Sequence, residues 1–299
     1  MSNTELPPAL EAERMTMDRR AGPISYYVAG DGPPMLLLHS INAAGSAFEV
    51  KPIFEHFRRT RRVFVPDLPG FGFSDRSERD YSVRLYTDAV HDLVDEVSSD
   101  EPIDALALSL TSEFLARAAS ESPDRFRSLV LVTPTGFNRG ADRLREPAGS
   151  TREMPWLYKF LTVPLWRESL YGLLVKPKVI RYFLKRTNGS DEFDAALAAY
   201  DDLTSHQSGA ENAPYAFLAG GLFSKDIRNV YESLTMPVWL PHATRGDFKD
   251  FRGADWARAD SRWTVEAIEG GALPHFESPR AFFERAEAFY HSLNISTPE

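Results

Sequence analysis

Short, continuous apolar runs recur along this chain, and most of them are followed by a helix-like stretch. The runs 35–38 and 129–132 contain no polar residue at all. A strand that is apolar on both faces is buried on both faces, which is typical of a parallel sheet between two helix layers. We therefore expect an α/β fold with a mostly parallel, doubly wound sheet and right-handed crossovers. The expected strands are residues 34–39, 63–67, 103–108, 128–133, 238–242 and 263–268, and the expected helices include 86–97, 112–119 and 281–293.

Between Gly136 and about Leu234 this alternation stops, and the sequence becomes helix-like and rich in aromatic residues. Ligands of open α/β sheets bind at the carboxyl ends of the strands, so an insertion that leaves the sheet there can cover a site. We expect residues 13–136 and 235–299 to form the core, residues 137–234 a helical cap, and residues 1–12 a flexible tail. Most cap aromatics are expected to form the cap's own core, and the others to line a partly apolar cleft.

Composition narrows the classes of partner. The chain has 34 Lys and Arg against 43 Asp and Glu, a formal charge of −9, which does not favour nucleic acid or an anionic membrane. It has no cysteine, so disulfides and thiolate chemistry are excluded. No apolar run approaches the ~18 residues that span a bilayer, and the polar start is no secretory signal. We expect a cytoplasmic monomer or homodimer that acts on a small molecule, with no metal, cofactor, nucleic acid or membrane partner.

Ser109 marks the clearest candidate for chemistry, because it follows an expected buried strand and opens an expected helix. A nucleophilic serine at such a sharp turn usually has glycine two residues before and after it, since space there is short. Here the positions are Ala107, which is small, and Thr111, which is β-branched. Two further segments, 67–74 and 271–279, close other expected strands.

The segment 67–74, the strand–Ser109–helix unit and the segment 271–279 follow one another along the chain. This order resembles the α/β-hydrolase superfamily in its branch with a helical cap, over about residues 22–293. The resemblance implies that Ser109 is a nucleophile and that the backbone amides of Leu110 and Ile41 form an oxyanion hole for developing negative charge. Asn42 offers an extra side-chain donor there. The acid that orients the catalytic base is expected at Asp247, one residue after the usual spacing, which falls on Gly246; Asp250 is the reserve.

The base itself is missing from its usual place. In this superfamily a catalytic histidine stands about seven residues before a proline, and counting back from Pro279 reaches Ala272. A serine is a poor nucleophile until a neighbouring base takes its proton. Three histidines are candidates for a substitute base: His275, His242 and His206.

Glu113 is an auxiliary candidate, one helical turn beyond Ser109. A carboxylate in the first turn of a helix is favoured by the helix dipole, so a structural role is the simpler interpretation of Glu113.

The sequence is compatible with four functions. The first is a hydrolase with a displaced base, and the second is a non-hydrolytic relative such as a lyase, isomerase or cyclase. The third is a small-molecule binding protein, and the fourth is a hydrolase whose histidine was replaced. Ser40, Ala107, Thr111 and Gly246 also depart from the usual motifs, which favours natural divergence over one replacement. We predict an enzyme acting on a small, partly apolar carbonyl or ester compound, with hydrolysis marginally ahead of a non-hydrolytic reaction.

Overall fold

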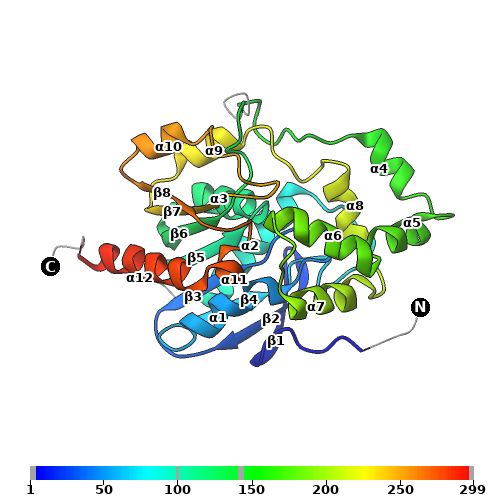
Figure 1. Cartoon of the computed structure of the whole chain (residues 1–299), viewed down its shortest axis with the longest axis horizontal. Coiled ribbons are helices and arrows are strands. Elements are labelled where there is room, and N and C mark those ends of the chain that lie inside the picture. The colour runs from blue at the N-terminus through cyan, green and yellow to red at the C-terminus, as the bar shows by residue number, and fades with distance from the viewer. Residues whose placement is uncertain (1–4, 99–100, 141–144, 296–299) are drawn as a thin grey trace.

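An eight-stranded sheet runs through the computed structural model of the chain, which describes residues 5–98, 101–140 and 145–295. Its strand order is β1-β2-β4-β3-β5-β6-β7-β8 (Figure 1). The first two pairings, β1 with β2 and β2 with β4, are antiparallel, and all pairings from β4 to β8 are parallel. The strands are β1(Glu13–Arg19), β2(Gly22–Ala29), β3(Pro34–Leu38), β4(Arg62–Pro66), β5(Ile103–Leu108), β6(Phe126–Val132), β7(Val238–Ala243) and β8(Trp263–Ile268).

The predicted sheet is confirmed, and all six predicted strands are present within two residues of their expected ends. The hairpin β1–β2 was not predicted. Six of the seven residues of β1 are exposed, with Met17 buried, so this edge strand lacks the apolar run that identified the others.

Helices cover both faces of the sheet (Figure 1). One face packs against residues of α2, α3, α9 and α10, and the other packs against α1 and α12. Ser82 caps α2 by accepting a hydrogen bond from the Leu85 amide, which satisfies one of the free N–H groups at the helix start. The bounds are α1(Lys51–Phe57), α2(Val83–Val97), α3(Thr111–Glu121), α9(Ile227–Ser233), α10(Asp255–Ala259), α11(Pro274–Glu277) and α12(Pro279–Ile295), with the 3-10 turns η1(Ala47–Val50) and η2(Pro123–Arg125).

The inserted helices form a separate layer with a small core of its own, built around Tyr171, Ile180 and Tyr215. They are α4(Pro155–Leu161), α5(Arg167–Leu174), α6(Pro177–Asn188), α7(Ala195–Ser205) and α8(Asn212–Leu218). Phe137 and α9 instead pack in the main core with Trp263. The cap is therefore shorter at both ends than the predicted range 137–234.

The described part of the amino-terminal segment packs against the core and against α7 of the cap. Leu6 and Leu10 are buried in the same cluster as Tyr200 of α7. The Ala9 amide donates to the Tyr27 hydroxyl at 3.0 Å, and the Tyr200 hydroxyl donates to the Pro7 carbonyl at 2.8 Å. The expected flexible tail therefore does not extend over residues 5–12, and residues 1–4 lie outside the described part.

None of the helices in the described ranges is long and apolar enough to cross a membrane.

Candidate functional site

Ser109 lies at a strained turn where β5 ends. Its backbone has φ 50, a left-handed conformation that costs a non-glycine residue about 1–2 kcal/mol. The Ser109 amide donates to the Val132 carbonyl on β6 at 2.9 Å, and Leu110 returns to right-handed helical geometry before α3 begins. The side chain of Ser109 is half-buried. The strand, the strained serine and the helix together form the elbow that the sequence predicted.

Thr111 fits this elbow through a hydrogen bond that a glycine could not make. Its hydroxyl donates to the carbonyl of His39 at 2.7 Å, and both residues are fully buried. The His39 imidazole is itself held inside the protein, since its Nε2 accepts from the Leu68 amide at 2.9 Å. Thr111 therefore joins α3 to the end of β3, and His39 has a structural position.

The loop after β3 is organised by Glu49, a buried carboxylate. Its oxygens accept from the Ser40 amide at 2.7 Å, from the Ser40 hydroxyl at 3.1 Å, and from Asn42 Nδ2 at 2.7 Å. Asn42 Nδ2 also donates to the Ser40 hydroxyl, and Asn42 Oδ1 accepts from the Ala44 amide. The Asn42 side chain is therefore occupied in shaping this loop, and Ser40 takes part in a network that glycine could not build.

Two backbone amides near the elbow remain available. Among the hydrogen bonds of the described residues, none uses the N–H of Ile41 or of Leu110. Their roles as oxyanion donors stay predictions.

The other half of the sheet edge is closed by the cap. The Ala272 amide donates to the Thr187 carbonyl at the end of α6, at 3.3 Å. A Cβ added to Gly271 would lie 2.3 Å from Asn188 Cα, so the two backbones touch. Ala272 is buried in this contact. The position predicted for the histidine is thus part of a backbone seam between the core and α6.

Asp247 belongs to the same seam. Its amide donates to the Arg186 carbonyl at 3.0 Å, and its carboxylate pairs with the Arg186 guanidinium at 2.7 Å, with 43% of the side chain exposed. Asp250 pairs with Arg252, whose hydrogen bond holds the pKa of that carboxyl far below its usual range. Both carboxylates face surface arginines, so this geometry does not support either as the acid that orients a base.

A different ion pair joins the loops after β7 and β8. Arg245 binds Glu277 at 2.5 Å, and its Nε donates to the Asn188 carbonyl at 3.0 Å. The other oxygen of Glu277 accepts from the Gly271 amide at 2.8 Å. An arginine and a glutamate therefore connect the two loops that an acid and a histidine would connect in a serine hydrolase.

His275 is fully buried away from Ser109. Its Nε2 donates to the carbonyl of Glu49 at 2.7 Å, and its ring packs beside Phe276 and Phe282. Burial lowers the pKa of His275 to about 4. The imidazole is neutral at pH 7 and serves packing, so the structure does not support it as the substitute base.

His242 and His206 are also engaged elsewhere. His242 stacks on Phe251 with ring centroids 4.3 Å apart, and burial lowers its pKa. His206 is partly exposed at the end of α7, where its Nδ1 lies 2.6 Å from the carbonyl of Asp202. No hydrogen bond within the described residues joins an imidazole to the Ser109 hydroxyl.

Glu113 is buried beside the elbow in α3. It accepts from the Thr135 hydroxyl at 2.5 Å and from the Ser224 amide at 2.9 Å. Burial raises the pKa of Glu113 to about 6, although both hydrogen bonds favour the ionised form. These contacts tie the first turn of α3 to the segments that lead into and out of the cap, which agrees with the structural interpretation.

Thr133 has a strained backbone beside Ser109 that the sequence analysis did not predict. It follows β6, next to Ser109 at the end of β5, and has φ 46. Its side chain is buried, and its hydroxyl has no partner among the described residues. A β-branched residue rarely adopts this conformation, and strained residues of this kind gather at functional sites. No motif at Thr133 signals the conformation, so only the structure could reveal it.

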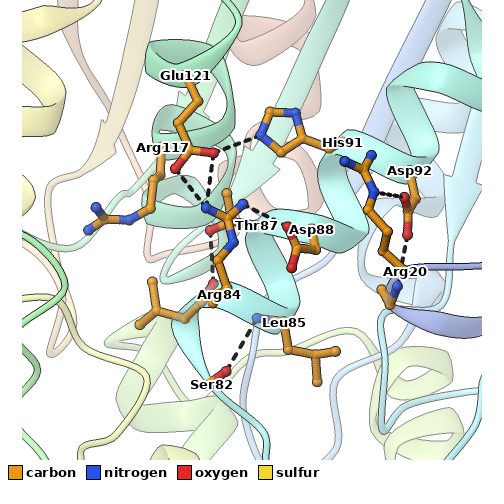
Figure 2. A network of polar contacts seen from close by, with 12 residues as sticks. Arg20, Ser82, Arg84, Leu85, Thr87, Asp88, His91, Asp92, Arg117 and Glu121 are labelled. Atoms are coloured by element: carbon orange, nitrogen blue, oxygen red, sulfur yellow. Dashed lines mark hydrogen bonds and ion pairs between the residues drawn. The ribbon is translucent and has the colours of Figure 1, made fainter.

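Two further histidines, His91 and His56, contact carboxylates away from the elbow. Figure 2 shows His91 of α2 contacting Glu121 of α3, with the two groups 2.8 Å apart, while Arg84 binds the same carboxylate. His56 contacts Glu287 in the same way at 2.8 Å. Within the described ranges no group of three or more His, Asp or Glu side chains could hold a metal ion.

Comparisons with known proteins extend these observations. The family described as "alpha/beta hydrolase fold" matches residues 33–172. An uncharacterised protein of Mycobacterium tuberculosis is 24% identical over 297 residues, covering 95% of this chain and 81% of that protein. The 2-hydroxymuconate semialdehyde hydrolase of Pseudomonas putida is 25% identical over 222 residues, covering 72% of this chain and 78% of that enzyme.

Among solved structures, a serine hydrolase involved in carbazole degradation superposes with a TM-score of 0.73 at 13% identity. The superposition covers 94% of this chain and 99% of that one. The strand order, the elbow at Ser109 and these matches agree that the chain has the α/β-hydrolase fold.

Proposed function

We propose that this protein is an enzyme that binds a small, partly apolar carbonyl compound between the sheet and the cap. The carbonyl oxygen accepts hydrogen bonds from the amides of Leu110 and Ile41, and the Ser109 hydroxyl lies beside it. Backbone donors that are fixed before the substrate arrives stabilise the negative charge that develops on such an oxygen.

The proposed reaction is non-hydrolytic. It passes through an enolate, as in a lyase, isomerase or cyclisation reaction: the C–H bond next to the carbonyl breaks, its proton leaves to solvent water, and solvent returns a proton as the product forms, so that no acyl-enzyme is needed. One observation carries this proposal: Ser109 keeps φ 50, while no imidazole of the described residues binds its hydroxyl. Strain of this kind persists where the surrounding structure imposes it, which favours continued use of the elbow. The lack of a base favours a use other than nucleophilic attack.

Hydrolysis through Ser109 is the second candidate. It is favoured by the relative from Pseudomonas putida, which is named a hydrolase and aligns with 72% of this chain. It requires a base that reaches Ser109 from a position not seen in the structure.

Ester turnover separates these two candidates. We expect the wild type to hydrolyse a short-chain nitrophenyl ester within about 10-fold of the Ser109→Ala variant, because a positioned general base normally contributes ~10²–10⁴-fold. Ala272→His is expected to gain less than about 10-fold, because Asp247 is bound to Arg186 and does not hold a new imidazole. Wild-type turnover ~100-fold or more above Ser109→Ala would reverse the order of the candidates.

A second assay tests the enolate chemistry directly. Proton NMR follows solvent-deuterium exchange at the carbon next to the carbonyl of small ketones. We expect exchange faster than in buffer, and slower again in Ser109→Ala. Exchange at the buffer rate across a panel of linear and cyclic ketones, with a folded protein, would contradict an enolate reaction.

A further inference from the structure

The outer side of the cap exposes an unusual number of large apolar side chains. Of the eleven such residues in the described ranges, eight lie between positions 154 and 186, and they are 36% to 85% exposed. Soluble proteins seldom gather exposed aromatic and leucine side chains in one segment unless that surface has a partner. The eight residues are Met154, Trp156, Phe160, Leu165, Trp166, Leu173, Tyr182 and Phe183.

Five of these residues lie on α4, on α5 or in the turn between the two helices. We call the surface that they form the cap patch: Trp156, Phe160, Leu165, Trp166 and Leu173. Phe160 and Trp166 contact each other across the turn between the helices, with ring centroids 5.5 Å apart. Together with Leu173 they line a shallow hollow of ≈ 360 Å³. Figure 1 places α4 and α5 at the edge of the molecule opposite α10 and α12.

The indole of Trp166 suits an apolar environment. Its Nε1 donates to the Phe160 carbonyl at 2.9 Å, so the ring enters a medium without water and leaves no N–H unsatisfied. Tryptophan, phenylalanine and leucine are the side chains that proteins insert at the boundary between lipid headgroups and acyl chains.

The segment that carries the cap patch has a formal charge opposite in sign to that of the whole protein. Residues 154–186 contain seven Lys and Arg against the single acid Glu168, although the chain as a whole carries −9. Three of these cations are paired: Arg167 with Glu78, Lys185 with Asp191, and Arg186 with Asp247. The other four are exposed and have no ion pair within the described residues: Lys159, Lys176, Lys178 and Arg181.

Three of these cations lie close in sequence to residues of the cap patch. Lys159 lies on α4, next to Phe160 and three residues after Trp156. Lys176 and Lys178 follow Leu173 at the junction of α5 and α6. Flexible, compact ammonium groups suit diffuse anionic headgroups better than a fixed bidentate partner.

We propose that the cap patch docks on an anionic lipid surface, with Trp156, Phe160 and Leu165 entering the interface and the four free cations contacting headgroups. A polybasic segment next to an apolar surface gains about 1 kcal/mol per cation at an anionic membrane. Association of two copies through the same patch is disfavoured, because a twofold interface brings the like charges of both copies together. The net charge of the whole chain conceals this local surface.

Vesicle binding tests the proposal with the full chain. Sedimentation with vesicles of 70% phosphatidylcholine and 30% phosphatidylglycerol is compared with pure phosphatidylcholine vesicles. We expect preferential binding to the anionic vesicles, weaker binding at high salt because exposed charges are screened, and a blue shift of tryptophan fluorescence. Equal binding to both vesicles, or no binding to either, overturns the proposal.

Variants locate the contact. Trp156→Ser with Leu165→Ser is expected to reduce the bound-to-free ratio by about 10-fold or more, and Lys159→Glu with Lys178→Glu by a similar factor. Matched controls change exposed residues outside the cap patch: Met15→Ser with Phe248→Ser, and Arg59→Glu with Lys249→Glu. Unchanged melting temperatures show that the variants fold.

Two outcomes of the variant series count against the lipid surface. Equal losses in the patch variants and their controls overturn the proposal. A wild-type dimer in sedimentation velocity that dissociates in the patch variant, with vesicle binding unaffected, identifies a second copy as the partner instead. Ser109→Ala is expected to bind vesicles like the wild type, which separates this surface from the function proposed at the elbow.

Discussion

The two halves of the sheet's carboxyl edge have different fates in this protein. At the ends of β3, β5 and β6 the structure has the strained Ser109 elbow and a loop fixed by Glu49. At the ends of β7 and β8, where the sequence analysis expected an acid and a base, the structure has contacts with α6 and the pair Arg245–Glu277. In the function that we propose, the first half positions a carbonyl and the second half is structural.

At the position predicted for the histidine, the loop after β8 packs against α6. Thr187 and Asn188 of α6 lie against the backbone of Gly271 and Ala272, and Arg186 holds Asp247 by both its amide and its carboxylate. The contacts fasten the cap to the core where a catalytic side chain would otherwise need space.

The backbone seam at Gly271 gives the largest expected effect. Gly271→Ala places a methyl group 2.3 Å from Asn188 Cα, and neither backbone can yield easily. We expect the free energy of unfolding to fall by about 3 kcal/mol, measured by urea titration. Gly172→Ala, whose new methyl group meets nothing within 4 Å, is the matched control and is expected to be neutral or slightly stabilising. Equal stability of the two variants would show that α6 does not touch this loop.

His275 makes the stability of the folded protein sensitive to acid. Its pKa is about 4 in the folded state, below the 6.5 of a free imidazole, so the unfolded chain binds the extra proton between these values. Stability is therefore complete above about pH 6.5 and falls by about 3 kcal/mol as the pH drops to 4. His275→Gln removes this part of the pH dependence in unfolding titrations, and exposed His291→Gln controls for loss of an imidazole. A slope that His275→Gln leaves unchanged would mean that His275 is solvated.

Glu113 contributes the opposite dependence of the free energy of unfolding on pH. Its pKa is about 6 in the folded state against 4.5 for a free carboxyl, so the folded protein binds the extra proton. Stability from this group is present below about pH 4.5 and falls by about 2 kcal/mol as the pH rises past 6. Glu113→Gln keeps one acceptor for Ser224 and removes the titration. The expected result is a steeper net gain in stability from pH 4 to 7 than in the wild type; a shallower gain would contradict the buried carboxyl.

Relief of strain at the elbow is the smallest expected effect on stability. Ser109→Gly adopts φ 50 without a Cβ clash, so the free energy of unfolding is expected to rise by about 1 kcal/mol. Ser112→Gly is the matched control, because Ser112 lies inside α3 and its hydroxyl donates to the Ala107 carbonyl. That variant is expected to lose about 1 kcal/mol. Destabilisation by both changes would argue that Ser109 is not strained.

The sequence predicted those parts that depend on local pattern. Continuous apolar runs identified the parallel strands, and the position of Ser109 between a strand and a helix identified the elbow. The polar edge strand β1 and the docking of residues 5–12 were missed, because single apolar residues such as Met17 and Leu10 carry no periodic signal.

Side-chain direction was beyond the sequence. The spacing of Asp247 suggested an acid, yet its carboxylate turns to Arg186, a residue 61 positions earlier on a cap helix. Likewise, His275 lies three residues from the expected base, yet its ring turns inward to the Glu49 carbonyl. Both orientations depend on tertiary contacts that no local motif records.

The labelling rate of Ser109 tests most directly whether the loops after β7 and β8 supply a base to this serine. A fluorophosphonate probe reacts with an activated serine, and intact-protein mass spectrometry at several pH values measures the rate. If these loops supply no base, labelling is slow, does not differ between the wild type and Ser109→Ala, and shows no inflection in the pH range where an imidazole titrates. Rapid, stoichiometric labelling that is lost in Ser109→Ala would show that a base serves Ser109, and it would contradict this account.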